Sequence, residues 1–542
     1  MQHVTAVCSM LHEAPSLELN SATRAFRGQP VLAWTASRLT RAARLASIVI
    51  ICWEDQLDAV EPIAAEQGLD VLNRGKRGSL AQLDAVSAAR RWADGWRGGL
   101  LETCDFDAGF HAPSLVQILE GHDGCDALVL VDPSAGLVDA AMIDALIDHA
   151  ETHAAQEIVF SPAAPGLSGV LLRPVLVERL AQAKTHPGKL LHYLPEHPCK
   201  DPIAGEGCAP VATRVARTTH HFKLNSRRQV DRVTEAMTPL NGQLIRSAAE
   251  ELVSRMTSTP MMDALPREIT LELNTRRATK PIYSSIRHLD IERPDIAPET
   301  VAALFEEIGE ADDIRLTLAG VGDPLLHANA LEIIDVAHRC GIRAVHVETD
   351  LLNIDAATLR RLAASPLDVL TIHIPALTHE TYATVMGADA YAQVLDNIRT
   401  LLTEKQNQKS CVPLVVPTFT KCAANLAEME AWYDQWLRAL GTAVIVGPST
   451  FAGLIPDAGV ADMSPPKRRP CNRLASRLTV LSDGAIVLCE QDITGKQPLG
   501  VVGRDKIANV WRDRFAPARQ NHARGDFALH ALCGGCTEWH RP

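Results

Sequence analysis

The sequence predicts an α/β protein with a doubly wound N-terminal domain, a central partial (β/α)6 barrel of TIM type and a small C-terminal cysteine-bearing domain. Three observations predict this. Residues 1–235 alternate short apolar runs with helical patterns, residues 263–460 repeat a strand–helix unit, and residues 461–542 contain a short hairpin and a terminal Cys-x2-Cys pair. Strands separated by helices form mostly parallel sheets, and repeated right-handed crossovers curl such a sheet into a barrel. Residues 236–262 are expected to form a helical linker.

The composition is that of a globular protein and argues against two broad functions. The chain has 542 residues, a formal net charge of −12 and only 4% aromatic residues, so neither a basic surface nor a base-stacking platform for nucleic acid is expected. No apolar run is long enough to span a membrane, and the first fifteen residues lack the pattern of a signal peptide. We therefore expect a cytoplasmic protein that binds neither nucleic acid nor membrane, with its thirteen cysteines mostly reduced.

In the N-terminal third, runs rich in valine, isoleucine and leucine predict strands, and amphipathic segments between them predict helices. The expected strands are Val4–Ser9, Ser47–Trp53, Ala127–Asp132 and Glu157–Ser161, and the expected helices include Leu80–Asp94 and Asp139–Ala155.

The middle third repeats the strand–helix unit six times, which predicts the open barrel. Ligands of such barrels bind at the C-terminal ends of the strands. The expected strands are Ile269–Asn274, Asp313–Gly320, Arg343–Asp350, Val369–Pro375, Val412–Thr418 and Thr442–Pro448, and the expected helices are Pro298–Gly309, His327–Cys340, Asp355–Ala364, Ala390–Glu404 and Leu426–Leu440.

The C-terminal segment contains four cysteines with the spacing of a metal centre. A hairpin is expected from Arg477–Leu481 and Ala485–Cys489, joined by an Asp-Gly turn. A Cys-x2-Cys turn directs two thiolates at one point, and two distant cysteines complete a tetrahedron. Spacing alone does not separate zinc from an iron–sulfur cluster. The predicted ligands of this single centre are Cys471, Cys489, Cys533 and Cys536.

The surroundings of these cysteines resemble the SPASM domain of radical SAM proteins. The likeness rests on Pro470-Cys471, on the Gly-x4-Cys spacing of Gly484 and Cys489, and on the segments 499–502, 507–511 and 532–539. SPASM domains bind auxiliary 4Fe–4S clusters, so the resemblance implies an iron–sulfur cluster rather than zinc. Longer members carry more cysteines and two clusters, whereas four cysteines imply one.

The middle domain is similar to the radical SAM fold. Leu316–His327 resembles the second-strand motif of that family, which usually ends Gly-Glu-Pro and holds the amino group of S-adenosylmethionine. Val347–Leu352 and Leu367–Ile372 resemble the ends of the third and fourth strands. The resemblance makes four residues candidates for binding S-adenosylmethionine, namely Gly320, Gly322, Asp323 and Pro324.

The defining Cys-x3-Cys-x2-Cys motif of radical SAM enzymes is absent after the first strand. The register places Arg277, Pro281 and Ser284 at the three cysteine positions. Arginine has no lone pair for iron and proline has no side-chain ligand. Arg276, Arg277 and Lys280 make the loop cationic, which suits a phosphate or carboxylate ligand but also a solvated loop. Either the barrel binds S-adenosylmethionine or another small molecule without radical chemistry, or it is a scaffold for the C-terminal cluster.

Residues 1–235 are similar in layout to nucleotidyltransferases and family-A glycosyltransferases. Phe26–Trp34 resembles the start of a helix in those enzymes, and Ser47–Asp55 resembles their second strand. Asp105, Asp107 and Asp132 lie near strand ends, where such enzymes bind magnesium. The first strand, however, lacks their glycine-rich phosphate loop, and turn or cap roles are favoured over metal binding for Asp105 and Asp107.

Three functions follow from these patterns. The first is a radical SAM/SPASM-type iron–sulfur protein without its own radical-generating cluster, which acts as a redox or accessory protein for a peptide or protein partner, or binds a small molecule. The second is a radical SAM-type enzyme that modifies a peptide or small molecule with substituted cluster ligands. The third is a nucleotide- or sugar-transferring enzyme that acts through residues 1–235. The missing cysteines favour the first over the second.

Overall fold

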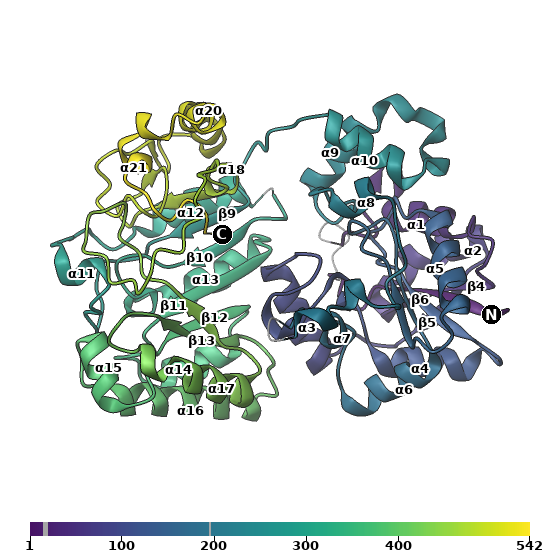
Figure 1. The fold of residues 1–542 in the computed structure, drawn as a ribbon, viewed down its shortest axis with the longest axis horizontal. Helices are drawn as coiled ribbons and strands as arrows, with labels where there is room; N and C mark the ends of the chain where they lie inside the picture. The colour runs from purple at the N-terminus through teal and green to yellow at the C-terminus, as the bar shows by residue number, and fades with distance from the viewer. Residues whose placement is uncertain (15–19, 195–196, 310, 542) are drawn as a thin grey trace. The chain divides into compact units, whose positions relative to one another are not determined.

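The computed structural model describes residues 1–14, 20–194, 197–309 and 311–541. These residues form two compact units, Met1–Met262 and Asp263–Pro542, which are coloured purple to teal and teal to yellow in Figure 1. No helix in the described part of the chain combines the length and apolar character needed to cross a membrane.

The described residues of the N-terminal unit form a six-stranded sheet in the order β5-β4-β1-β6-β8-β7. Strand β1 pairs in parallel with both β4 and β6, whereas β8 runs antiparallel to its two neighbours. The chain therefore builds outward from β1 to one side and then crosses to the other side at β6. In open α/β sheets, this switch point at the carboxyl ends of the strands is where ligands bind. The strands are β1 (Val4–Ser9), β4 (Ser47–Cys52), β5 (Asp70–Asn73), β6 (Ala127–Leu130), β7 (Ile158–Phe160) and β8 (Val170–Leu172).

Both faces of this sheet are covered, as expected for a doubly wound fold. Along β1, Val4 and Ala6 belong to one buried cluster, and Val7, between Ala6 and Cys8, belongs to another. This alternation places one core on each side of the strand. The covering helices are α1 (Val31–Leu39), α2 (Leu57–Gln67), α3 (Ala81–Trp92), α4 (Ala112–Gly121), α5 (Ala140–Thr152) and α6 (Pro174–Ala183).

The segment expected to be a helical linker is helical and packs on the N-terminal unit. Helix α10 (Ala249–Ser258) buries Leu252 and Val253 in one core cluster with Phe222. The backbone N–H of Ala249 donates to Asp139 Oδ2 at 2.6 Å.

In the C-terminal unit, the described residues form a nine-stranded sheet in the order β14-β13-β12-β11-β10-β9-β15-β16-β17. Strands β9 to β14 are parallel and follow one another in chain order, so the predicted strand–helix repeat of the partial barrel is confirmed (Figure 1). The barrel strands are β9 (Glu268–Leu271), β10 (Arg315–Leu318), β11 (Ala344–Thr349), β12 (Val369–His373), β13 (Leu414–Thr420) and β14 (Val444–Val446). Their helices are α12 (Pro298–Ile308), α13 (Ala330–Arg339), α14 (Ala356–Ala364), α15 (His379–Met386), α16 (Tyr391–Asn407) and α17 (Met429–Leu440).

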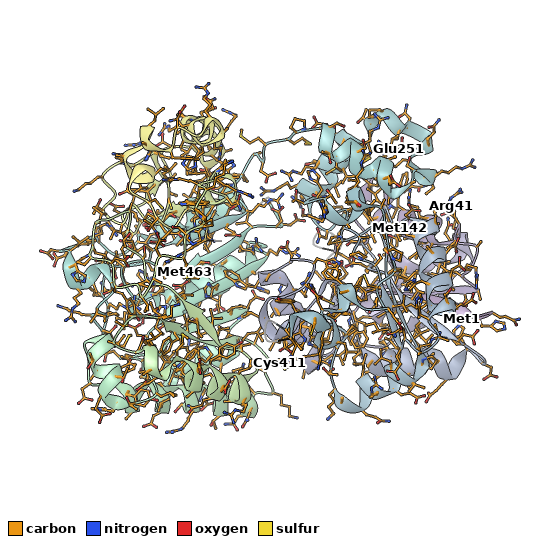
Figure 2. The ribbon with its side chains drawn as sticks, viewed as in Figure 1. Met1, Arg41, Met142, Glu251, Cys411 and Met463 are labelled. Carbon is orange, nitrogen blue, oxygen red and sulfur yellow. The ribbon has the colours of Figure 1, made fainter. Side chains whose placement is uncertain are left out.

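The cysteine-bearing segment continues the barrel sheet. Strand β15 (Arg477–Val480) pairs in parallel with β9, and β16 (Ala485–Val487) and β17 (Gly500–Val501) follow in antiparallel order, so the predicted hairpin is confirmed. Ile269, Trp511 and Cys533 belong to one buried cluster. The barrel and the C-terminal segment therefore share one sheet and one core. The connecting segment between β14 and β15 carries Met463, which is 72% exposed (Figure 2).

Candidate functional site

A buried ion pair lies at the C-terminal ends of the barrel strands, where the family resemblance implied a cluster. Arg277 follows β9, and its guanidinium contacts the Asp350 carboxylate at the end of β11 through Nε–Oδ2 at 2.8 Å and Nη2–Oδ1 at 2.5 Å. Arg277 Nη2 also donates to Nδ1 of His373, the last residue of β12, at 2.8 Å. The side chain of Asp350 is fully buried and that of Arg277 is 12% exposed. The ends of three barrel strands, β9, β11 and β12, are thus joined by one cation.

The charges of this site balance internally. Burial acts to raise the pKa of Asp350, but the charge and hydrogen bonds of Arg277 hold that pKa well below its usual range. Burial raises the pKa of Asp323, and the negative charge of Asp350 raises it further. The site therefore holds one anion, Asp350, paired with one cation, Arg277, and Asp323 ionises less readily.

The predicted S-adenosylmethionine turn is occupied by contacts within the chain. Asp323 Oδ2 accepts hydrogen bonds from Thr349 Oγ1 and from the backbone N–H of Asp350, both at 2.8 Å, and Oδ1 accepts from the N–H of Leu325 at 3.0 Å. Pro324, buried, begins the short 3-10 turn Pro324–Leu326 that follows. The carboxylate is thereby committed to fixing the end of β10 against the end of β11.

The two glycines of the same turn are explained by close packing. A Cβ at Gly322 would lie 2.4 Å from the carbonyl oxygen of Asn274, and a Cβ at Gly320 would lie 2.6 Å from Cγ of Glu272. Separations this short do not occur between real Cβ atoms and their neighbours. Gly320 and Gly322 therefore let the turn after β10 lie directly against the chain that leaves β9.

Glu272 is a buried charge whose role the sequence analysis missed. Both of its carboxylate oxygens contact Arg293 at 2.9 Å, and they also accept the N–H groups of Val321 at 3.0 Å and Ser482 at 3.2 Å. This carboxylate thus ties β9 to the turn after β10 and to the hairpin of the cysteine-bearing segment. The signal in the sequence is a single acidic residue inside an apolar strand pattern.

The loop at the three missing cysteine positions is fixed without a metal. The N–H groups of Lys280 and Ile282 donate to the carbonyls of Met386 and Val385, each at 2.9 Å, and Ser284 Oγ donates to the Pro281 carbonyl at 2.8 Å. Neither arginine nor proline offers a ligand to iron, so the residues at 277, 281 and 284 do not fit a radical-generating 4Fe–4S cluster.

The cationic character expected for this loop is largely neutralised. Arg276 forms an ion pair with Asp295 at the surface, and Arg277 forms the buried pair with Asp350. Lys280, the third cation of the loop, is exposed.

The four cysteines of the predicted metal centre gather around Cys471. Besides burial, a negative charge on its sulfur raises the pKa of Cys489, Cys533 and Cys536, so the four side chains lie in one region. All four are free thiols, and in the described part of the chain no three His, Cys, Asp or Glu side chains are spaced to hold a metal ion as they stand. The structure thus brings the four predicted residues to one region. That they bind a metal centre remains a prediction.

The surroundings of these thiols suit thiolate ligands. Burial raises the pKa of Cys533 to about 11, with smaller contributions from Cys471 and Cys536, so without a metal this thiol is protonated at neutral pH. The N–H of Glu538 donates to Cys536 Sγ at 3.3 Å, and the positive charge of Arg473 lowers the pKa of both Cys489 and Cys536 against the effect of burial. Four sulfur donors with N–H groups and an arginine beside them fit a thiolate-bound iron–sulfur cluster.

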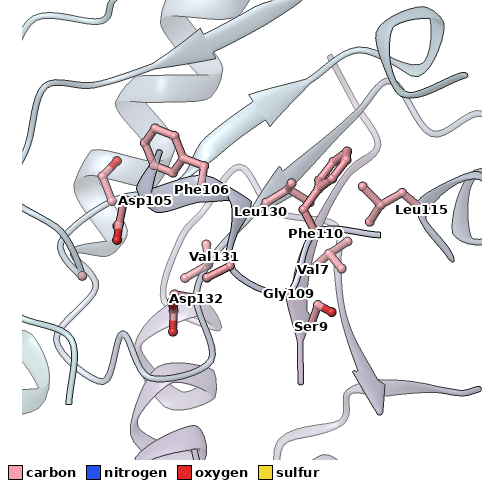
Figure 3. Close-up of a pocket in the computed structure, with 13 residues that line it drawn as sticks. Val7, Ser9, Asp105, Phe106, Gly109, Phe110, Leu115, Leu130, Val131 and Asp132 are labelled. Carbon is pink, nitrogen blue, oxygen red and sulfur yellow. The ribbon is translucent and has the colours of Figure 1, made fainter. Parts of the chain in front are cut away.

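The three aspartates predicted in the N-terminal unit separate into two groups. Asp107 is fully buried, and it accepts the N–H groups of Cys104 at 2.7 Å and Gly188 at 2.9 Å, which is the turn and cap role favoured from the sequence. Asp105 and Asp132 line a cavity of about 30 Å³ at the switch point of the sheet (Figure 3). That volume holds roughly two water molecules.

Comparisons with known proteins agree with the motifs. Residues 282–428 match the family model of the radical SAM superfamily, and residues 471–537 match that of the SPASM iron–sulfur cluster-binding domain. The radical SAM match begins after Arg277 and Pro281. A protein of Treponema pallidum (strain Nichols), described as uncharacterized, is 25% identical over 289 residues, which cover 51% of this chain and 79% of that protein.

Similarities to solved structures are weaker. BtrN in complex with AdoMet and 2-DOIA is 16% identical to this chain, with a TM-score of 0.37. The match covers 51% of this chain and 94% of the BtrN chain. Native anSMEcpe with bound AdoMet and Cp18Cys peptide is 10% identical, with coverages of 50% and 87% and a TM-score of 0.37. A cytidylyltransferase from Leptospira borgpetersenii is 13% identical, with coverages of 48% and 100% and a TM-score of 0.34. The chain contains a radical SAM domain, matched over residues 282–428, and a SPASM iron–sulfur cluster-binding domain, matched over residues 471–537.

Proposed function

We propose that this chain is a radical SAM/SPASM-type iron–sulfur protein that holds one auxiliary 4Fe–4S cluster and has no radical-generating cluster. The cluster is bound by Cys471, Cys489, Cys533 and Cys536, and it serves electron transfer with, or recognition of, a protein or peptide partner. The observation that carries this proposal is the buried pair of Arg277 with Asp350 at the place of the missing cluster loop.

The energetics of that pair support the proposal. Removing one partner of a buried ion pair leaves an uncompensated charge and costs about 3–5 kcal/mol. A ligand that displaced Arg277 from Asp350 would meet a cost of this size before it gained any contact of its own. The hydrogen bond of Arg277 to His373 adds to this cost.

The same contacts argue against the turn after β10 as a site for S-adenosylmethionine. The family resemblance assigns this turn to the amino group of that molecule. Here the Asp323 carboxylate accepts three donors from the chain itself, and the glycines are required by packing against Asn274 and Glu272. The retained Gly-x-Gly-Asp-Pro pattern thus has a structural explanation that needs no bound cofactor.

The cysteine region supports a cluster near the surface. Cys471, Cys489 and Cys536 are partly exposed, and Cys533 is buried in the core shared with the barrel. Glu490 forms ion pairs with Arg473 at 2.8 Å and with Arg477 at 3.2 Å. Because Arg477 lies on β15, these pairs fix the chain beside Cys489 to that strand. A cluster on a fixed frame with an accessible side suits exchange of electrons with a partner.

The test is anaerobic reconstitution with iron and sulfide, followed by analysis of both per chain. We expect roughly four irons and four sulfides per chain in the wild-type protein. Cys533→Ala should lose most of them, and Cys340→Ala, which removes a partly buried thiol packed on the same core cluster, should retain them. About eight irons per chain, or one zinc without sulfide, would refute the proposal.

A further inference from the structure

A buried lysine separates the two carboxylates at the switch point of the N-terminal sheet. Lys223 Nζ contacts Asp105 Oδ1 at 3.0 Å and Asp132 Oδ2 at 2.5 Å. The three side chains are each about nine-tenths buried. A single ammonium group therefore bridges the two aspartates that the sequence placed near a magnesium site.

The remaining contacts of these aspartates are also made within the chain. Asp132 Oδ1 accepts the N–H of Ser134 at 2.8 Å and its hydroxyl at 2.6 Å, and Arg90 Nη2 lies 3.6 Å from Asp105 Oδ1. Two carboxylates thus face two cations, so the group has no net formal charge.

Lys223 and Asp132 are both ionised at neutral pH. Burial acts to lower the pKa of Lys223, but the charges of Asp105 and Asp132 raise that pKa above its ordinary value. Burial acts to raise the pKa of Asp132, but the charge and hydrogen bond of Lys223 hold that pKa well below its usual range. The contact of Lys223 with Asp132 is therefore an ion pair and not a neutral hydrogen bond.

Magnesium does not fit this arrangement. Mg²⁺ needs an octahedron of oxygen ligands at about 2.0–2.1 Å. The place between the two carboxylates is taken by the ammonium, Asp107 is committed to Cys104 and Gly188, and the other walls include apolar Phe110 and Leu115 (Figure 3).

We propose that the ammonium group of Lys223 is a built-in cation that replaces a divalent metal between Asp105 and Asp132. The N-terminal unit then binds no magnesium-bound nucleotide through these carboxylates, and any ligand of the adjoining cavity is bound without a metal. This inference concerns the N-terminal unit alone and does not depend on the cluster proposed for the C-terminal unit.

Removal of the ammonium should create the metal site. In Lys223→Met, a side chain of similar length leaves the two carboxylates without their bridging cation. We expect this variant of the full chain to bind about one Mn²⁺ more per chain than the wild type, measured by electron paramagnetic resonance of free Mn²⁺. The double variant Lys223→Met/Asp132→Asn should lose that site. A Lys223→Met protein that gains neither Mn²⁺ binding nor a Mn²⁺-dependent rise in melting temperature would overturn the proposal.

The wild-type protein gives a second test that does not depend on the folding of Lys223→Met. Asp105→Asn keeps the pair of Lys223 with Asp132 and should match the wild type, with no difference in Mn²⁺ bound per chain. If the wild type binds a Mn²⁺ ion that Asp105→Asn loses, the carboxylates hold a metal despite Lys223 and the proposal is wrong.

Discussion

The adjacent residues Arg276 and Arg277 allow the buried ion pair to be tested against a surface pair of the same chemistry. Arg277 pairs with Asp350, which is fully buried. Arg276 pairs with Asp295, and the side chains of these two residues are 55% and 37% exposed, respectively. Replacing each arginine with methionine removes one cation and retains much of the side-chain volume. We expect Arg277→Met to cost about 3–5 kcal/mol of unfolding free energy. Arg276→Met should cost about 0–1 kcal/mol.

The assay is urea unfolding of the cluster-loaded protein without oxygen, followed by tryptophan fluorescence. With a slope of about 3 kcal/mol per molar urea, the midpoint for the C-terminal unit should fall by roughly 1–1.7 M in Arg277→Met and by no more than about 0.3 M in Arg276→Met. Circular dichroism before addition of urea checks that each variant is folded.

A double-mutant cycle separates the pair from other effects of losing the arginine. Arg277→Met/Asp350→Asn removes both charges, so it should recover a large part of the stability lost in Arg277→Met. If Arg277→Met and Arg276→Met shift the midpoint equally, the buried pair does not hold the barrel mouth and the reasoning fails.

Three further predictions concern the same unit. Restoring the cysteine motif by Arg277→Cys, Pro281→Cys and Ser284→Cys should raise reconstituted iron from about four to about eight atoms per chain, and an unchanged iron content would show that the loop cannot reach cluster geometry. The pKa of Asp350 is lower in the folded state than in the unfolded state. Ionised Asp350 therefore stabilises the fold above about pH 4, and this stabilisation is lost as pH falls further. The unfolding free energy of Arg277→Met/Asp350→Asn should thus fall less steeply than that of the wild type between about pH 5 and pH 2. Gly322→Ala, whose Cβ would lie 2.4 Å from the Asn274 carbonyl, should cost about 1–3 kcal/mol, whereas Gly121→Ala, with no atom within 4 Å, should cost far less, as measured by thermal melts.

The order of the elements could be read from the sequence because their periodicity is strong. Barrel strands such as β10 alternate buried and less buried residues between amphipathic helices, and their predicted positions agree with the structure to within a few residues. Strands β5 and β8, with four and three residues, were missed.

The pairing of charges could not be predicted from the sequence. Arg277 could be assigned to a cysteine position by register, but its partner Asp350 lies 73 residues away and Lys223 lies 118 residues from Asp105. Such pairs are fixed by how strands are ordered in a sheet, which local patterns do not encode. In the same way, Gly320 and Gly322 suggested a ligand site from the sequence alone. The residues that require glycine at these positions follow another strand, β9, and could not be identified from the local pattern.

The position of β15 in the sheet means that strand β9 can complete its pairing only late in synthesis. Strand β9 pairs with β10 on one side and with β15 on the other, and the ion pair of Arg477 with Glu268 that spans this edge joins residues 209 positions apart. At about 5–20 residues per second, a ribosome needs roughly 10–40 s to make the intervening chain. Through that interval, the first barrel strand presents an unpaired edge to the cell. A nascent chain that is truncated before residue 477 keeps this open edge, so prematurely ended products should be targets for chaperones and proteases.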